Sequence, residues 1–241
     1  MLRRQQMRML EILVEVDRIC KKHNIRYWLS SGTLIGALRH NGFIPWDDDL
    51  DIEMMRSDYL RLMQILPSEL PDWLALQNDE TDPNYFYFYA KVRDRRSKML
   101  EQNGYDRLWK EQGIYIDIFP MEQHPIWLHK LTEKSVGHMY KIWRTSTDDE
   151  KAIKSVRRIF NFNNRYFFPC LRPLPKYDNM TIEFRSFRFG AYLCPPCGRR
   201  RVRRCLPRRF AKPCWLETSS RRRNGWADGM RFAGMWCMVG P

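Results

Sequence analysis

Five carboxylates lie within seven positions between Asp47 and Glu53, and these are the residues of the chain best suited to metal chemistry. From Asp49 onward acidic and apolar residues alternate, so the period of two of a β-strand places the acids on one face. Carboxylates packed this closely repel one another unless a cation lies between them. Their hard oxygen atoms favour Mg²⁺, Mn²⁺ or Ca²⁺ over zinc. Asp49 and Asp51 are therefore predicted to hold a catalytic Mg²⁺ (or Mn²⁺) ion against phosphate oxygens.

Two other interpretations of the acidic run stay open. An acidic run is commonly a solvated loop that binds nothing. Asp47, Asp49 and Asp51 also match the first three ligand positions of a calcium-binding loop. That loop requires Gly at its sixth position and Glu at its twelfth, where this chain has Ile52 and Asp58, so a calcium loop is disfavoured.

The segment before the acidic run predicts a binding site for an anion. Residues 27–29 are typical of a strand, residues 30–32 of a tight turn and residues 33–39 of a short helix. A glycine turn at the start of a helix presents backbone N–H groups to an anion. The predicted phosphate seat consists of three consecutive residues, Ser31, Gly32 and Thr33.

Two polar residues, Arg39 and His40, lie at the end of that helix, and Trp46 lies beyond it. Arg39 is predicted to contact a phosphate, because its guanidinium matches phosphate oxygens in geometry and charge. His40 joins it in the predicted substrate-binding set, with a general base and a hydrogen-bonding structural residue as alternatives. Trp46 either stacks on a nucleobase or fills the core, and the core is the default expectation.

Alternation over residues 85–93 predicts a strand that presents tyrosines, Lys91 and Arg93 on one face. Such a row is suited to one wall of a nucleotide site, in which the lysine meets a diphosphate. Lys91 and Arg93 are therefore predicted to bind substrate. A solvated polar face is the alternative.

A single acid, Asp117, interrupts an apolar strand predicted at residues 114–120. Burying a carboxylate without a partner is costly, so a partner is expected. A metal ion is one candidate partner. An arginine, or the start of the next helix, is the other.

The stretch from Gly32 to Ile52 reads GTLIGALRHNGFIPWDDDLDI and resembles the signature of the LicD family over its whole length. Residues 91–94 (KVRD) and 116–120 (IDIFP) resemble two later segments of that family. The family includes phosphorylcholine transferases and is related to the fukutin-type transferases. The resemblance implies an α/β (α+β) fold, in which a nucleotidyltransferase-like mixed sheet is flanked by helices and followed by a helical C-terminal part. It also favours Asp117 as a third carboxylate, either metal ligand or base.

Composition divides the chain near residue 185. Residues 185–241 hold thirteen Arg and one Lys against two acids, and also five of the seven cysteines. The net charge of +14 therefore belongs almost entirely to this segment, which has no apolar periodicity. Residues 1–184 are predicted to form the catalytic domain, and residues 185–241 a disordered or non-native tail of the kind that a change of reading frame produces.

The chain offers no apolar run of the ~18 residues that a membrane-spanning helix needs. No long apolar region follows the basic N-terminus, so no signal peptide is expected. A cytoplasmic location is expected, with peripheral contact at the inner face of the membrane.

The resemblance implies transfer of phosphocholine, or of a similar phospho-alcohol, from CDP-choline or another CDP-alcohol donor. The acceptor would be a sugar hydroxyl of a cell-surface glycan or glycolipid such as lipopolysaccharide or teichoic acid, and CMP would leave. A conventional nucleotidyltransferase acting at the α-phosphorus is the enzymatic alternative. A protein that binds nucleic acid through its basic Cys-rich tail is the non-catalytic alternative, although the charge distribution disfavours nucleic acid as a partner. A third alternative is a damaged member of the family that has no activity.

Overall fold

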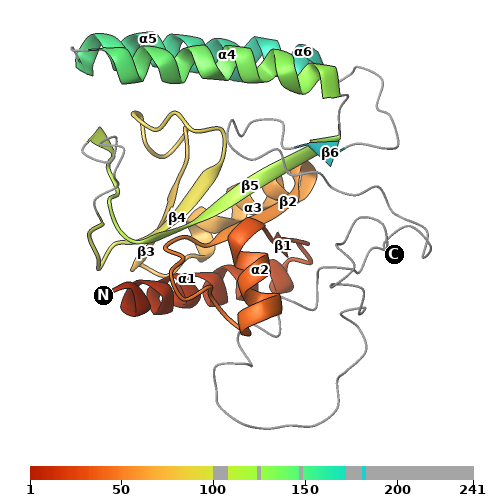
Figure 1. Cartoon of the computed structure of the whole chain (residues 1–241), viewed down its shortest axis with the longest axis vertical. Coiled ribbons are helices and arrows are strands. Elements are labelled where there is room, and N and C mark those ends of the chain that lie inside the picture. The colour runs from red at the N-terminus through yellow and green to blue at the C-terminus, as the bar shows by residue number, and fades with distance from the viewer. Residues whose placement is uncertain (100–107, 124–125, 147–148, 172–180, 183–241) are drawn as a thin grey trace, which may run out of the picture.

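The computed structural model describes residues 1–99, 108–123, 126–146, 149–171 and 181–182, so the tail predicted for residues 185–241 lies outside the described residues. Figure 1 shows the arrangement of the elements. In chain order they are α1 (Leu2–Lys22), β1 (Trp28–Leu29), α2 (Ser31–His40), β2 (Asp51–Met55), α3 (Arg56–Glu69), β3 (Leu74–Gln77), β4 (Ala90–Asp94), β5 (Tyr115–Gln123), α4 (Ile126–Thr145), α5 (Asp149–Phe162), the π-helix η2 (Asn163–Phe167), α6 (Phe168–Leu171) and β6 (Thr181–Ile182).

The strands form one mixed sheet in the order β1-β2-β5-β4-β3, and β6 pairs with β5 beyond this path. β2 and β5 run parallel, whereas the other neighbouring strands run antiparallel. Helices flank the sheet, and α4, α5 and α6 form a helical layer in the C-terminal half (Figure 1). The predicted fold class, a mixed sheet flanked by helices with a helical C-terminal part, is confirmed.

One face of the sheet is apolar and carries the main core. Alternate residues of the three central strands, Ile52 and Met54, Ala90 and Val92, and Ile116 and Ile118, are buried in one cluster. The same cluster contains the apolar side of α1 and of α3, whose period of 3.6 residues places Met9, Leu13 and Val16, and Leu62 and Leu66, toward the sheet. The apolar residues of positions 3–23 recur with the period of an amphipathic helix, which predicts a helix there, and α1 confirms it.

The other face of the sheet is polar and yet buried, which is the unusual feature of this fold. Asp51, Glu53, Lys91, Arg93 and Asp117 each expose less than a tenth of their surface. Buried charges must be paired or must bind an ion, so this face is where function is expected.

A second, aromatic cluster lies apart from the main core. It unites α4 and α5 with Trp109 and the four consecutive residues 85–88. The strand predicted over residues 85–93 is therefore wrong in its first half, because β4 begins only at Ala90. In a strand, odd-numbered and even-numbered residues would point to opposite faces, but Tyr85 to Phe88 are all buried. The alternation of Tyr and Phe therefore reflects packing under the helical layer rather than a strand.

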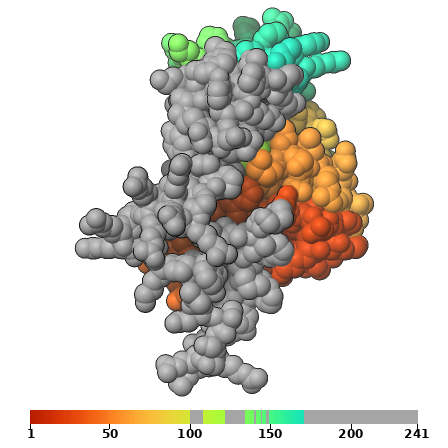
Figure 2. All heavy atoms as spheres, turned by 90° about the vertical axis from the view of Figure 1, so that its right-hand side faces the viewer, coloured from red at the N-terminus to blue at the C-terminus, as the bar shows by residue number. Residues whose placement is uncertain are grey.

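Figure 2 shows the N-terminal elements, in red and orange, and the C-terminal helices, in green and turquoise, at opposite ends of the molecule. The sequence also predicts a helix at residues 126–144 from its apolar residues and a second helix after residue 147 from a capping-box pattern, and α4 and α5 confirm these two helices. No helix in the described part of the chain is both long enough and apolar enough to cross a membrane.

Two cysteines of the described ranges differ in their surroundings and should differ in reactivity. Burial, with smaller contributions from Asp17 and Asp58, raises the pKa of the Cys20 thiol to about 12, whereas Cys170 is exposed. Because the thiolate is the nucleophile, iodoacetamide should modify Cys170 in the native protein and Cys20 only after unfolding. Peptide mass spectrometry after timed alkylation measures both sites, and equal rates at the two would contradict the packing of α1.

Candidate active site on the polar face of the sheet

The register of three strands places two acids and a lysine in one row. Asp51 of β2 lies opposite Asp117 of β5, and Asp117 lies opposite Lys91 of β4. The Nζ of Lys91 donates to Oδ1 of Asp117 at 2.7 Å, and it also lies 3.3 Å from the ring centroid of Tyr115. The predicted pairing alternative for Asp117 is therefore partly realised, with a lysine rather than an arginine.

Asp51 is held by its backbone, while its carboxylate accepts no hydrogen bond from the described residues. Its N–H donates to the Oγ1 of Thr33 at 2.9 Å, and its carbonyl accepts from the N–H of Ser30 at 3.0 Å. Only 4% of Asp51 is exposed. A buried carboxylate without a hydrogen-bond donor is expensive, so this position is suited to a ligand that is itself positive.

The raised pKa values of the acids in and beside this row also favour the binding of a further positive charge. Burial first, and then the charges of Asp117 and Asp49, raise the pKa of Asp51 to about 9, against the opposing effect of Lys91. Burial and the neighbouring acids Asp47, Asp117 and Asp48 raise the pKa of Asp49 to about 6. One lysine cannot neutralise carboxylates from the loop and from two strands. Their oxygen-only donor set fits a divalent cation such as Mg²⁺ or Mn²⁺.

Glu53, the next acid on the same face of β2, is already satisfied. Its carboxylate accepts hydrogen bonds from the Oγ of Ser30 and, at 2.8 Å, from the indole Nε1 of Trp28. These contacts tie the start of α2 and β1 to β2. Glu53 therefore acts as a support of the site rather than as a free acid within it.

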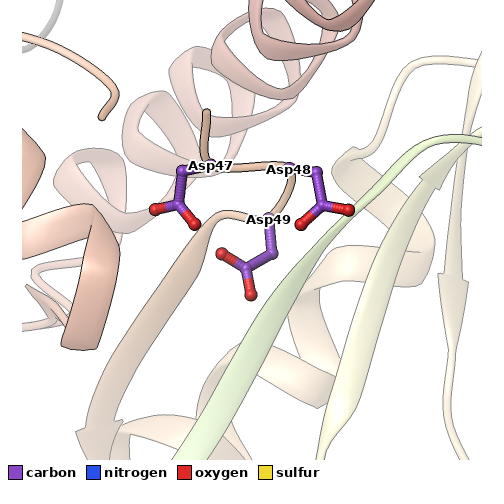
Figure 3. A group of neighbouring side chains, drawn as sticks. All are labelled: Asp47, Asp48 and Asp49. Atoms are coloured by element: carbon purple, nitrogen blue, oxygen red, sulfur yellow. The ribbon is translucent and has the colours of Figure 1, made fainter. Parts of the chain in front are cut away.

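The loop before β2 adds two acids that were not in the predicted set. Figure 3 shows Asp47, Asp48 and Asp49 projecting from this loop, and one carboxylate oxygen of each lies within 4.8 Å of the others. The Oδ2 of Asp47 is buried and has no hydrogen-bond partner among the described residues. The structure thus offers two overlapping ligand sets, the loop triad and the predicted set of Asp49, Asp51 and Asp117, which share Asp49.

The alternation rule explains why the sequence did not indicate the loop triad. That rule ranks acids by the face of a strand, and β2 begins only at Asp51. Asp47 and Asp48 precede the strand, so parity does not apply to them. The density of the Asp47–Asp49 run was the available signal.

The predicted phosphate seat has a different form in the structure. The chain turns sharply at Ser31, whose φ is 46°, but α2 already begins at this residue rather than at residue 33 as predicted. Thr33 is buried, and its hydroxyl accepts the hydrogen bond from the N–H of Asp51. A Cβ on Gly32 would lie 2.5 Å from the Oδ2 of Asp47, so the start of α2 directly faces the acidic loop. Ser31, Gly32 and Thr33 are thus brought beside the carboxylates, and their phosphate contact stays a prediction.

Arg39 and His40 lie at the far end of α2, where both are exposed. An α-helix rises ~1.5 Å per residue, so Arg39 is roughly 12 Å along the axis from Ser31. The structure does not bring these two residues into the carboxylate row, and their substrate contacts stay predictions.

Trp46 is 75% exposed, so the default expectation that it fills the core is wrong. A turn in which the N–H of Asp47 donates to the carbonyl of Ile44 at 3.0 Å directs the indole outward, edge-on to the ring of His40. The base-stacking alternative for Trp46 is compatible with this position next to the acidic loop.

Arg93 lies on the same face as Lys91, but it donates hydrogen bonds to other residues of the protein. Its Nε donates to Gln77 and its Nη1 donates to the carbonyl of Gly113 at 2.9 Å, and the residue is fully buried. Its guanidinium also lies 4.5 Å from the ring centroid of Tyr115. These contacts brace β3 and β5 against β4, and the substrate contact predicted for Arg93 stays a prediction.

Two glycines of α2 give a matched test of how this helix is positioned. A Cβ on Gly36 would meet backbone atoms, the carbonyl oxygen of Gly42 at 2.6 Å and the N of Ile44 at 2.8 Å. Gly36→Ala should therefore lower the free energy of unfolding by about 1–3 kcal/mol, as overpacking does. Gly32→Ala meets only the carboxylate of Asp47, so it should leave stability nearly unchanged and weaken metal binding instead. Urea unfolding and Mn²⁺ titration of both variants measure the two effects, and equal stability losses would contradict this assignment.

The mixed sheet with flanking helices is consistent with the LicD/FKTN/FKRP nucleotidyltransferase domain. Residues 24–176 match that domain, and the chain belongs to this family.

Three relatives show how far the similarity extends. The lipopolysaccharide cholinephosphotransferase LicD of Haemophilus influenzae is 36% identical over 119 residues, which cover 49% of this chain and 43% of that protein. The uncharacterized protein RP689 of Rickettsia prowazekii is 51% identical over 57 residues, or 24% of this chain and 21% of that protein. The ribitol 5-phosphate transferase FKRP of Homo sapiens is 42% identical over 45 residues, or 19% of this chain and 9% of that protein. The matched segments span less than half the length of each of these relatives.

Proposed function

We propose that the chain is a metal-dependent transferase that moves phosphocholine, or a similar phospho-alcohol, from a CDP-linked donor to a sugar hydroxyl of a cell-surface glycan. The observation that carries this proposal is the buried row of Asp51, Asp117 and Lys91, in which the carboxylate of Asp51 accepts no hydrogen bond from the described residues and its pKa is raised by burial and by neighbouring acids. Family membership supports the reaction class, because a cholinephosphotransferase and a ribitol 5-phosphate transferase are among the relatives.

The acids, the lysine and the start of α2 have different proposed roles. Asp49 and Asp51 would hold the cation together with Asp117 or with the loop acids, and the cation when bound would supply charge neutralisation at the donor diphosphate. Lys91 orients the carboxylate of Asp117 through their hydrogen bond of 2.7 Å. The start of α2 presents N–H groups on the same side as the acidic loop.

In the proposed reaction the acceptor hydroxyl oxygen forms a bond to the β-phosphorus of the donor. The bond from that phosphorus to the bridging oxygen breaks, and CMP leaves with the bonding electrons. Asp117 would accept the proton of the hydroxyl, a role supported by its position between Asp51 and Lys91 in the row. Trp46 is positioned for stacking on the cytosine, because its exposed ring stands beside the acidic loop.

Product identity tests this proposal. The full chain, Mg²⁺, CDP-choline labelled on choline, and lipopolysaccharide from a choline-free strain should yield CMP and labelled glycan in equal amounts. Transfer of the cytidylyl group, or release of pyrophosphate from CTP, would instead place the reaction at the α-phosphorus and support a conventional nucleotidyltransferase. Folded protein that releases neither product over many hours would contradict both assignments.

A further inference from the structure

A basic groove with a volume of about 820 Å³ lies along α5 and η2, away from the carboxylate row. It carries four cationic side chains and one carboxylate, Glu150. The cationic residues are Lys154, Arg157, Arg158 and Arg165. This volume falls within the range of ~300–1,000 Å³ that is typical of small-molecule sites.

The charges of this groove are not balanced within the described part of the protein. Elsewhere on the described surface many exposed bases pair with acids, for example Lys22 with Glu69 at 2.8 Å and Arg95 with Glu111 at 3.2 Å. None of the four groove cations forms an ion pair with a described residue. Unpaired guanidinium groups gathered in a hollow are suited to phosphate or carboxylate groups of a ligand.

Two exposed aromatic rings lie in the same groove. Phe162 is 57% exposed and Tyr166 is 56% exposed, with their ring centroids 6.2 Å apart. They belong to the junction of α5 with η2, and π-helical turns occur frequently at functional sites. Apolar ring faces beside cations are suited to the C–H face of a sugar that carries anionic substituents.

The groove connects to the carboxylate row through one short segment. Asn84 lines the groove, and Lys91 of the row follows seven residues later. Between them the rings of Tyr85 and Tyr89 lie 6.5 Å apart, and the ring of Tyr89 lies 5.5 Å from the Nζ of Lys91. An extended chain of seven residues reaches at most ~25 Å, so Asn84 of the groove and Lys91 of the row lie no farther apart than this.

We propose that the groove on α5 and η2 binds the acceptor as an oligosaccharide that carries phosphate groups. The identification of this ligand as the acceptor rests on the proposed function. The binding itself requires neither donor nor metal. A hollow with two separate rings favours a saccharide over a flat membrane surface, which would demand a protruding apolar face. Single-stranded RNA has the same charge and is the competing ligand in the test.

The test uses the full chain and the lipid-free core oligosaccharide of lipopolysaccharide, before and after enzymatic removal of its phosphates, with an RNA oligonucleotide of matched charge. Lys154→Glu/Arg158→Glu reverses two charges in the groove. Lys134→Glu/Lys141→Glu makes the same change at exposed residues of α4 outside it. Tyr166→Ala removes an exposed ring without changing any charge, so it tests the groove independently if a charge variant misfolds.

The groove pair should weaken binding of the phosphorylated oligosaccharide at least about tenfold, and the α4 pair less than about twofold. Tyr166→Ala should weaken it as well, and removal of the phosphates should abolish the difference between the two pairs. CDP-choline binding, measured on the same proteins, should be unchanged by all of these variants. Equal losses for the two charge pairs, or unaltered binding after dephosphorylation, would overturn the groove proposal and leave the proposed function standing. Tighter binding of RNA with the same sensitivity to the variants would assign the groove to nucleic acid instead.

Discussion

Asp51→Asn should abolish metal-dependent catalysis while leaving the metal-free protein at least as stable as the wild type. The substitution keeps the shape of the side chain and removes a carboxyl group whose ionised form is disfavoured by burial and by Asp117 and Asp49. Because Asp51 accepts no hydrogen bond from the described residues, the amide loses no partner. Mn²⁺ affinity, measured by calorimetry, should fall at least about 100-fold, which is the upper end of the effect of altering only the support of a ligand.

Two control substitutions separate the possible ligand sets. Asp72→Asn makes the same change at an exposed aspartate and should leave metal affinity unchanged. Asp48→Asn tests the loop triad. If Asp48→Asn weakens Mn²⁺ binding as much as Asp51→Asn does, the ion is held by loop and strand together. If Asp51→Asn has no effect on Mn²⁺ binding, the assignment of Asp51 as a ligand is wrong.

Asp51 should also make metal-free stability depend on pH in an unusual direction. Its pKa is raised to about 9 in the folded state, against an unfolded value of about 3.9, so the folded protein retains a proton that the unfolded chain releases. The free energy of unfolding should therefore fall as pH rises between these two values. Asp51→Asn cannot titrate and should show a shallower fall in metal-free urea unfolding. Parallel profiles for the two proteins would contradict the burial of Asp51.

Lys91→Met should produce the second large effect, a loss of about 3–5 kcal/mol of stability. Such a loss is typical when one partner of a buried ion pair is removed. Lys91 is 1% exposed, and its ammonium group donates a hydrogen bond to Asp117 and lies close to the Tyr115 ring. Its removal leaves Asp117 buried without that donor and next to Asp51. Unlike most core variants, Lys91→Met should regain stability when Mg²⁺ is added, because the cation replaces part of the lost charge.

Lys98→Met is the matched control, since Lys98 is exposed. It should change the melting temperature by no more than about a degree, as surface substitutions do. A Lys91→Met protein that unfolds at the wild-type temperature would show that Lys91 does not compensate the acids. A destabilised Lys91→Met protein that is indifferent to Mg²⁺ would place the metal away from Asp117.

Much of the fold was predictable because it follows from periodicity alone. The 3.6-residue pattern of residues 3–23 and the alternation after Asp49 depend only on which neighbours are apolar, and α1 and β2 follow them. The prediction for residues 85–93 failed because Tyr and Phe alternate there without a strand. Their burial depends on α4 and α5, the first of which begins 38 residues after Phe88.

The site was predictable in its residue types but not in its geometry. Asp51, Lys91 and Asp117 were each identified from local sequence, yet nothing local fixes the pairing of β2 with β5 and of β5 with β4 that aligns them. The exposure of Trp46 depends on the turn at Ile44, and so the sequence alone did not predict this exposure. The groove on α5 and η2 depends on a π-helical turn, for which the sequence has no simple pattern.

The most direct test of the central claim is calorimetric titration of the full chain with CDP-choline, first with Mg²⁺ and then with EDTA. The carboxylate row predicts saturable binding that requires the ion and is lost in Asp51→Asn, whereas Asp72→Asn binds as the wild type does. Binding that is equally tight in EDTA, or no binding by protein with a cooperative unfolding transition, would contradict the assignment of this site to a metal-bound CDP donor.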